Sequence, residues 1–184
     1  MNNPILFKIN YSKAIEAIIW LANKKPNIDI YHIAKILFYA DKMHINKYAR
    51  PIIGDTYKKM PYGPVPSAIR DLIRENMWLL DEHLEEIAKS LLIDKSTKYY
   101  NLTAKRKPDL SYFSKSDMDF LTNSLNKYGE LPFDELYNLT HLEKCYYQTQ
   151  DKDSIDYALF IDDDNPFKDE ILKDMQEKSL CMGI

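Results

Sequence analysis

Asp41 and His44 form the pair whose residue types and spacing could do chemistry in this chain of 184 residues. They stand three positions apart in a segment predicted to be helical, so both side chains lie on one helix face. A carboxylate and an imidazole in that arrangement could bind a metal ion or transfer a proton. A third group could come from His141, Asp55 or His32. One interpretation is therefore a metal-dependent enzyme that uses Asp41, His44 and His141.

The same pair also has a structural interpretation, which we favour. Asp41 and His44 continue an apolar stripe at helical spacing, so both side chains face the predicted core. The loop that follows, within residues 48–71, holds four of the nine prolines and two of the four glycines of the chain. An inward carboxylate beside such a loop can accept hydrogen bonds from loop amides that have no partner in a sheet. We therefore expect the pair to anchor the loop, with Arg50 paired to Asp55 or Asp41.

The familiar motifs of enzymes and nucleotide-binding proteins do not occur in the sequence. Neither the P-loop pattern nor the dinucleotide-binding glycine pattern is present, and GxSxG and HExxH are also missing. Cys145 and Cys181, the two cysteines, are too few for a disulfide framework or a cysteine-based zinc site. The acidic run at 162–164 lacks the ligand spacing of an EF-hand loop. We expect a protein without cofactor and without enzymatic activity.

Composition and charge restrict the class of partner. The chain is 45% hydrophobic and 29% charged, values typical of a soluble globular protein. Its formal net charge of −3 and its four arginines make a nucleic acid an unlikely main partner by the usual phosphate contacts. No apolar run is long enough to cross a bilayer, and the N-terminus lacks the pattern of a signal peptide. We expect a cytoplasmic protein that does not bind membranes.

The elements that position these residues are predicted to be mostly helical. Apolar residues at helical spacing indicate each helix, and capping or helix-breaking residues indicate where it begins and ends. The predicted helices cover 12–23, Asp29 to about Tyr48, Gly63 to about Met77, roughly 79–92, Ser114 to about Tyr128, Pro132 to about His141, and a final helix from about Pro166.

Two further segments have the composition of extended chain. Residues 91–102 predict a β-hairpin around a polar turn at 94–97, and residues 54–62 contain a short extended stretch. Gly129 is expected to end its helix in the left-handed conformation. Without an internal repeat or a convincing linker, the prediction is one compact, mainly α domain over 1–184 with a small β-hairpin or wing.

The helix and loop around Asp41 also resemble a known family. The runs "FYADKMH" at 38–44, "ARPIIGD" at 49–55 and "YGPVPS" at 62–67 are similar to the pattern of the Panacea domain, found in SocA-like antitoxins and phage-associated GepA-type proteins. The histidine of "LTH", His141, resembles that of a second block. The resemblance covers about residues 10–160, which leaves 161–184 as a C-terminal helical extension. Ala49 stands where glycine is common in the family, and Pro61 and Tyr62 stand where Lys-His is frequent.

The resemblance implies a mostly helical antitoxin that neutralises a cognate protein toxin by direct binding. In one type of member the antitoxin acts as an adaptor that delivers its toxin to a bacterial protease. The family does not specify the toxin, the binding surface or the oligomeric state, and a phage or prophage protein that binds a host defence factor remains an alternative. The motif residues that would hold the loop or contact a partner are Asp41, His44, Arg50, Pro51, Gly54, Asp55, Tyr62, Gly63, Pro64, Pro66, Ser67 and His141.

Overall fold

The computed structural model describes residues 4–75 and 81–181. Helices dominate it and the strands are short, in agreement with the predicted mainly α fold. The elements, in chain order, are α1 (Tyr11–Lys24), β1 (Ile28–Asp29), α2 (Ile30–Tyr48), β2 (Tyr57–Met60), β3 (Gly63–Pro66), α3 (Ser67–Arg74), α4 (Asp81–Ser90), β4 (Leu91–Asp94), β5 (Asn101–Ala104), the 3-10 helix η1 (Leu110–Tyr112), α5 (Lys115–Tyr128), α6 (Phe133–His141), α7 (Lys144–Tyr147), the 3-10 helix η2 (Tyr157–Phe160) and α8 (Lys168–Cys181).

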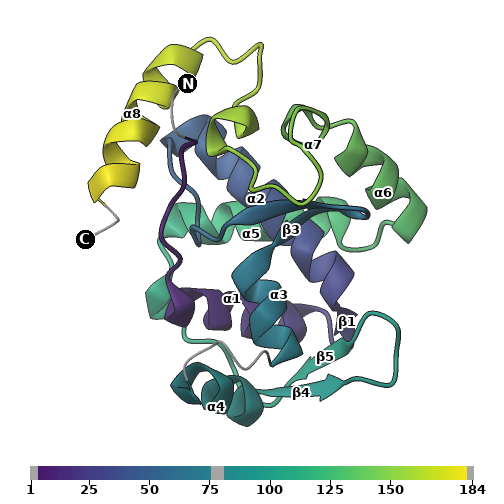
Figure 1. The fold of residues 1–184 in the computed structure, drawn as a ribbon. Coiled ribbons are helices and arrows are strands. Elements are labelled where there is room, and N and C mark those ends of the chain that lie inside the picture. The colour runs from purple at the N-terminus through teal and green to yellow at the C-terminus, as the bar shows by residue number, and fades with distance from the viewer. Residues whose placement is uncertain (1–3, 76–80, 182–184) are drawn as a thin grey trace.

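Helix α2 runs through the middle of the molecule, with α5 packed along it and α8 against its C-terminal end (Figure 1). Asp29 caps α2 as predicted, since its carboxylate accepts a hydrogen bond from the backbone N–H of His32 at 2.8 Å. The helix ends at Tyr48, and the residue that follows it, Ala49, adopts the left-handed conformation with φ 53°. That conformation disfavours any residue with a Cβ, which explains why glycine suits this position.

The hydrophobic core joins segments that are far apart in the sequence. One buried cluster includes Ile5 near the N-terminus, the inner faces of α1 and α2, and Met175 of α8. The predicted C-terminal helix begins at Lys168, two residues after the expected Pro166. None of the helices in the two described ranges is long and apolar enough to cross a membrane.

The predicted hairpin at 91–102 is present and belongs to a larger sheet. Strands β4 and β5 pair antiparallel, and β1 adds to the other edge of β5, which gives the strand order β1-β5-β4. Leu91 therefore begins a strand, whereas the helix prediction over 79–92 had included it. The predicted start of that helix at residue 79, and Met77 at the end of the preceding one, lie outside the described residues.

The prediction that a helix begins at Gly63 is wrong. Residues Gly63–Pro66 form β3, which pairs antiparallel with β2, and α3 begins only at Ser67. Strand β2, which precedes this segment, supplies backbone hydrogen-bond partners for an extended chain. Pro66, the residue before α3, has backbone dihedral angles in the extended region. The structure thus contains a second hairpin, β2–β3, turned at Pro61 and Tyr62.

Helix α5 confirms one predicted end and corrects the other. Ser114 and Asp117 form the predicted capping box, in which each side chain accepts a hydrogen bond from the other residue's backbone N–H. Gly129 has φ −67°, so the predicted left-handed end is wrong. Its N–H still donates to the carbonyl of Leu125 at 2.8 Å, which keeps this residue in the geometry of the helix it follows.

Candidate functional site

The carboxylate of Asp41 lies beneath the loop that follows α2. It is 1% exposed and accepts hydrogen bonds from the backbone N–H of Ile52 at 2.7 Å and from the hydroxyl of Tyr57 at 2.9 Å. Burial raises the pKa of Asp41 to about 6, although both hydrogen bonds favour the charged form. The predicted hydrogen bond from a loop amide to an inward carboxylate is therefore present.

Asp55, at the end of the same loop, also accepts hydrogen bonds from backbone N–H groups. Its carboxylate accepts hydrogen bonds from the backbone N–H groups of Ala68 at 3.0 Å and Ile69 at 2.8 Å. Pro66, the residue that precedes α3, has no side chain that could accept these bonds, so Asp55 caps the helix from a distance. Burial raises the pKa of Asp55 to about 6. Sequence reasoning assigned Asp55 to a metal site or to Arg50, because nothing local connects it to a helix that starts twelve residues later.

Two glycines of the loop have positive φ, and neighbouring segments also approach both of them closely. Gly54 has φ +82°, and a Cβ there would lie 2.8 Å from the carbonyl oxygen of Lys8. Gly63 has φ +98°, and a Cβ there would lie 2.5 Å from Oγ1 of Thr140 and 2.9 Å from Nζ of Lys35. The two positions therefore require glycine for both conformation and space.

His44 extends from the same face of α2 to a second carboxylate. Its Nδ1 lies 2.9 Å from the carbonyl oxygen of Arg50, and its Nε2 lies 3.3 Å from Oδ1 of Asp117 at the start of α5. Asp117 is 1% exposed and also receives a hydrogen bond from Nζ of Lys13 at 2.7 Å. Burial opposes ionisation of Asp117, but the contacts with His44 and Lys13 hold its pKa well below the usual range.

The predicted pairing of Arg50 with Asp55 or Asp41 is wrong. Nη2 of Arg50 lies 3.0 Å from Oδ1 of Asp117 instead. Asp41 is directed at the loop amide of Ile52, and Asp55 at N–H groups in the first turn of α3, whereas the guanidinium group of Arg50 is partly exposed. Sequence reasoning treated Asp117 only as part of a capping box. An acidic residue in the first turn of a helix is common, so nothing in the sequence indicated that Asp117 would also contact His44 and Arg50.

The third residue of the metal hypothesis lies elsewhere. Nδ1 of His141 is 2.7 Å from the carbonyl oxygen of Tyr137, and its ring packs between Tyr137 and Tyr146 at centroid distances of 3.8 and 4.2 Å. Across residues 4–75 and 81–181, no three His, Cys, Asp or Glu side chains form a group that could hold a metal ion. Asp41, His44 and His141 are therefore not brought together.

The hairpin β2–β3 is held from its outer edge as well. The backbone N–H of Lys59 donates to the carbonyl of Asp153 at 3.0 Å, and that of Ile155 donates to the carbonyl of Tyr57 at 2.8 Å. The hydroxyl of Tyr146 adds a hydrogen bond to the carbonyl of Met60 at 3.0 Å. The hairpin is thus tied to the core by buried carboxylates on one side and by the 152–155 segment on the other.

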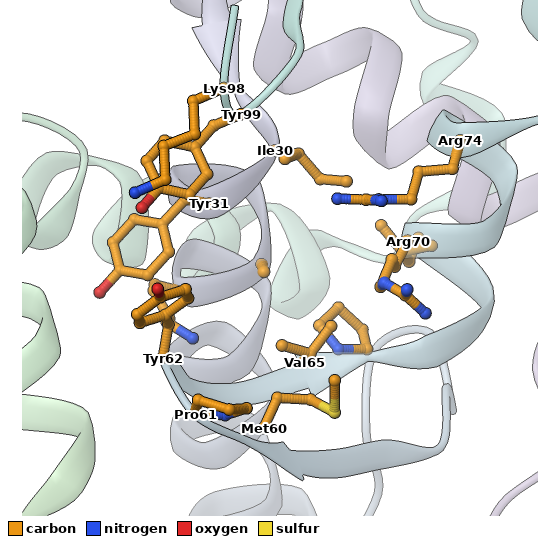
Figure 2. Close-up of a pocket in the computed structure, with 14 residues that line it drawn as sticks. Ile30, Tyr31, Met60, Pro61, Tyr62, Val65, Arg70, Arg74, Lys98 and Tyr99 are labelled. Carbon is orange, nitrogen blue, oxygen red and sulfur yellow. The ribbon is translucent and has the colours of Figure 1, made fainter.

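The fixed hairpin forms one wall of a cleft of about 330 Å³. Figure 2 shows the labelled tyrosines and Lys98 on one side of the cleft, Arg70 and Arg74 on the other, and Met60 and Val65 between them. The lining residues come from the β2–β3 hairpin, the start of α2, helix α3 and the β4–β5 loop. They are Ile30, Tyr31, Ala34, Lys35, Met60, Pro61, Tyr62, Val65, Pro66, Ile69, Arg70, Arg74, Lys98 and Tyr99.

Sequence reasoning identified only the part of this cleft that the hairpin supplies, namely Tyr62 and Pro66. The remaining lining comes from three separate segments, and no spacing along the chain relates them. The one local signal is a pair of arginines four residues apart, Arg70 and Arg74, which lie on one face of α3.

Comparison with known families matches residues 33–147 to the family described as Antitoxin SocA-like, Panacea domain. The match includes α2 from its fourth residue on, both restraining aspartates, the β2–β3 hairpin and His141. No curated protein matches the chain, and neither does any solved structure.

Proposed function

Because the chain belongs to the Antitoxin SocA-like, Panacea domain family, we propose that it is an antitoxin that neutralises a cognate protein toxin by binding it directly. The family match over residues 33–147 is the observation that carries this proposal. The matched segment contains the restrained hairpin and most of the cleft beside it. The antitoxin and its toxin would meet in the cytoplasm.

The geometry of the hairpin supports a role in binding. A segment that is already fixed loses little conformational freedom when a partner docks, so more of the contact energy appears as affinity. The hairpin also displays Tyr62, which is 46% exposed at the turn. Tyrosine, arginine and methionine are enriched at the centres of protein interfaces, and all three types line the cleft.

The catalytic alternative has less support. It required Asp41, His44 and His141 to converge, and the structure places His141 in a separate aromatic cluster. Asp41 is directed at Ile52 and Tyr57, so its carboxylate has structural partners already. The alternative of a phage protein that binds a host factor would use the same kind of surface and differ only in the identity of the partner.

The proposal is tested with the products of genes adjacent to the gene for this chain. Each product is expressed alone and together with the chain, and growth is recorded. We expect one product to arrest growth by itself, to be tolerated when the chain is present, and to bind the purified chain in a stoichiometric complex.

An immunoblot of the toxin separates two modes of neutralisation. If binding alone suffices, the toxin level is unchanged by the chain, whereas delivery to a protease lowers it. Rescue of growth without any complex, or a complex whose partner is harmless when expressed alone, would contradict neutralisation by direct binding.

A further inference from the structure

The cleft beside the β2–β3 hairpin differs in charge from the chain as a whole. The chain carries a formal net charge of −3, yet four basic side chains line the cleft. They are Lys35, Arg70, Arg74 and Lys98. Among the described residues of the lining there is no aspartate or glutamate. The local charge is therefore complementary to an acidic ligand, against the sign of the molecule.

Three of these basic side chains lie at the rim of the cleft, and Lys35 lies in its wall; the floor is apolar. Arg74 and Lys98 are exposed, and Arg70 is partly exposed. Nζ of Lys98 lies 5.8 Å from the ring centre of Tyr62 and 4.9 Å from that of Tyr99, so the ammonium group stays at the aromatic side of the cleft. The floor of the cleft is aliphatic and aromatic. The cleft volume of about 330 Å³ suits one or two side chains of a ligand.

Lys35 gives the wall an amine that has no carboxylate partner among the described residues. Its side chain is fully buried, and its Nζ donates to the carbonyl oxygen of Pro64 at 2.9 Å and lies 4.9 Å from the ring centre of Tyr31. Burial lowers the pKa of Lys35 to about 7. An anion brought into the cleft would favour the protonated form of this amine.

The hairpin edge at the cleft also limits how a ligand can bind. In the β2–β3 sheet, β3 pairs with β2 along one edge only. Pro64 and Pro66 occupy two of its four positions and have no N–H group to donate. An added strand would lack these hydrogen bonds, so main-chain strand addition is disfavoured. The prolines thus leave side chains, rather than a main-chain strand, as the means by which a ligand would bind at this edge.

We propose that this cleft binds a segment of a protein partner that carries an aromatic or aliphatic side chain flanked by carboxylates. The apolar side chain enters between Tyr62 and Val65, and the carboxylates pair with Arg70, Arg74 and Lys98. The identification of the partner as a protein toxin rests on the proposed function. The preference for an apolar group joined to a carboxylate rests on the cleft alone.

The first test uses small probes, so that it does not depend on a toxin. The full chain, labelled with ¹⁵N, is titrated with 3-phenylpropionate and, separately, with 3-phenylpropylamine at millimolar concentrations, the range expected for such small ligands. We expect the acid to shift the backbone amide signals of Tyr62, Val65 and Tyr99 in a saturable way. The amine, which has the same ring and the opposite charge, is expected to bind at least about fivefold more weakly.

Variants decide which charges matter. R70Q/R74Q is expected to weaken binding of the acid by about fivefold or more, because it removes two cations while keeping good helix formers. K24Q/K173Q removes two exposed lysines that do not line the cleft, and it is expected to leave binding within about twofold. If R70Q/R74Q does not fold, Lys98→Gln in the exposed β4–β5 loop serves instead.

The probe test has clear contrary outcomes. Equal binding of acid and amine would overturn the charge preference, and shifts elsewhere on the molecule, or no shift at all, would overturn the site. A change in sedimentation between wild type and R70Q/R74Q would assign the cleft to self-association and also overturn the proposal.

The second test uses the toxin once the growth experiment has identified it. R70Q/R74Q is expected to raise the Kd for the toxin at least about tenfold, while K24Q/K173Q changes it less than about twofold. If both variants bind the toxin like wild type, the cleft is not the docking site but the antitoxin function stands. If wild type binds no toxin, the proposed function fails, and the probe titration still decides what chemistry the cleft accepts.

Discussion

Replacing Asp41 tests whether its carboxylate holds the loop in place. Asp41→Ala removes the acceptor of two buried hydrogen bonds, from the N–H of Ile52 and the hydroxyl of Tyr57. Asp41→Asn is also uncharged, but its amide oxygen can still accept from Ile52, and its NH₂ group can donate to the hydroxyl oxygen of Tyr57. In both variants the hydroxyl proton of Tyr57 loses its acceptor, so the comparison cancels the cost of burying a charge and isolates mainly the hydrogen bond from the N–H of Ile52.

The expected difference follows from the burial of these donors. A buried donor left without a partner costs about 1–3 kcal/mol, and the N–H of Ile52 loses its acceptor only in the alanine variant, so Asp41→Ala is expected to be about 1–3 kcal/mol less stable than Asp41→Asn. In a domain of this size that corresponds to roughly 2–4 °C in Tm for each kcal/mol. Urea unfolding followed by circular dichroism measures the difference. The same two substitutions at Asp119, an exposed residue of α5, provide the control and are expected to differ by less than about 1 kcal/mol, with alanine the more stable because of its higher helix propensity.

The pH dependence adds a second, independent expectation. Burial raises the pKa of Asp41 to about 6, above its unfolded value of 3.8, so the native state binds more protons between these values. Stability from this group is therefore present below pH 3.8 and is lost as the pH rises through about 6, by roughly 3 kcal/mol in all. Asp41→Asn is expected to lack this decline. Equal stability of Asp41→Ala and Asp41→Asn, with the decline unchanged in both, would refute the anchoring role.

Three further predictions concern other parts of the scaffold. Ala49→Gly relieves the positive φ of residue 49 but also deletes a buried methyl group, so the free energy of unfolding is expected to change by less than about 1 kcal/mol; a larger loss would contradict this balance. Gly63→Ala is expected to lower the free energy of unfolding by more than about 1 kcal/mol, since its Cβ would meet Thr140, and an unchanged urea midpoint would contradict that close approach. The contacts of Asp117 hold its pKa below the unfolded value, so the stability it contributes is present above pH 3.8 and is lost as the pH falls further. The free energy of unfolding of Asp117→Asn should therefore fall less steeply at acid pH than that of wild type. An identical fall in both proteins would contradict the ion-pair cluster.

Most helices and the β4–β5 hairpin could be predicted, because apolar periodicity and caps are local features of a sequence. Asp29 and Ser114 marked helix starts that the structure contains. The second hairpin was missed because the prolines of β3 also suit a first helical turn, so local pattern did not separate the two conformations. Pairing with β2 decided the outcome.

The polar contacts of the site were predictable only where they follow from a single helix face. The inward position of Asp41 follows from the stripe on α2, and so does its hydrogen bond to the adjacent loop. The distant capping of α3 by Asp55 and the pairing of Arg50 with Asp117 depend on how segments meet in space. The cleft depends on four such segments, so its cationic lining could be recognised only from the fold.

The central claim is that this chain neutralises a toxin by binding it, and one measurement tests it most directly. Purified chain is titrated into the purified product of an adjacent gene that arrests growth when expressed alone, and heat of binding is recorded by isothermal calorimetry. The account predicts a saturable one-site complex, and growth rescue that is lost in variants that lose the complex. A growth-arresting product that the chain rescues without any measurable complex would contradict it.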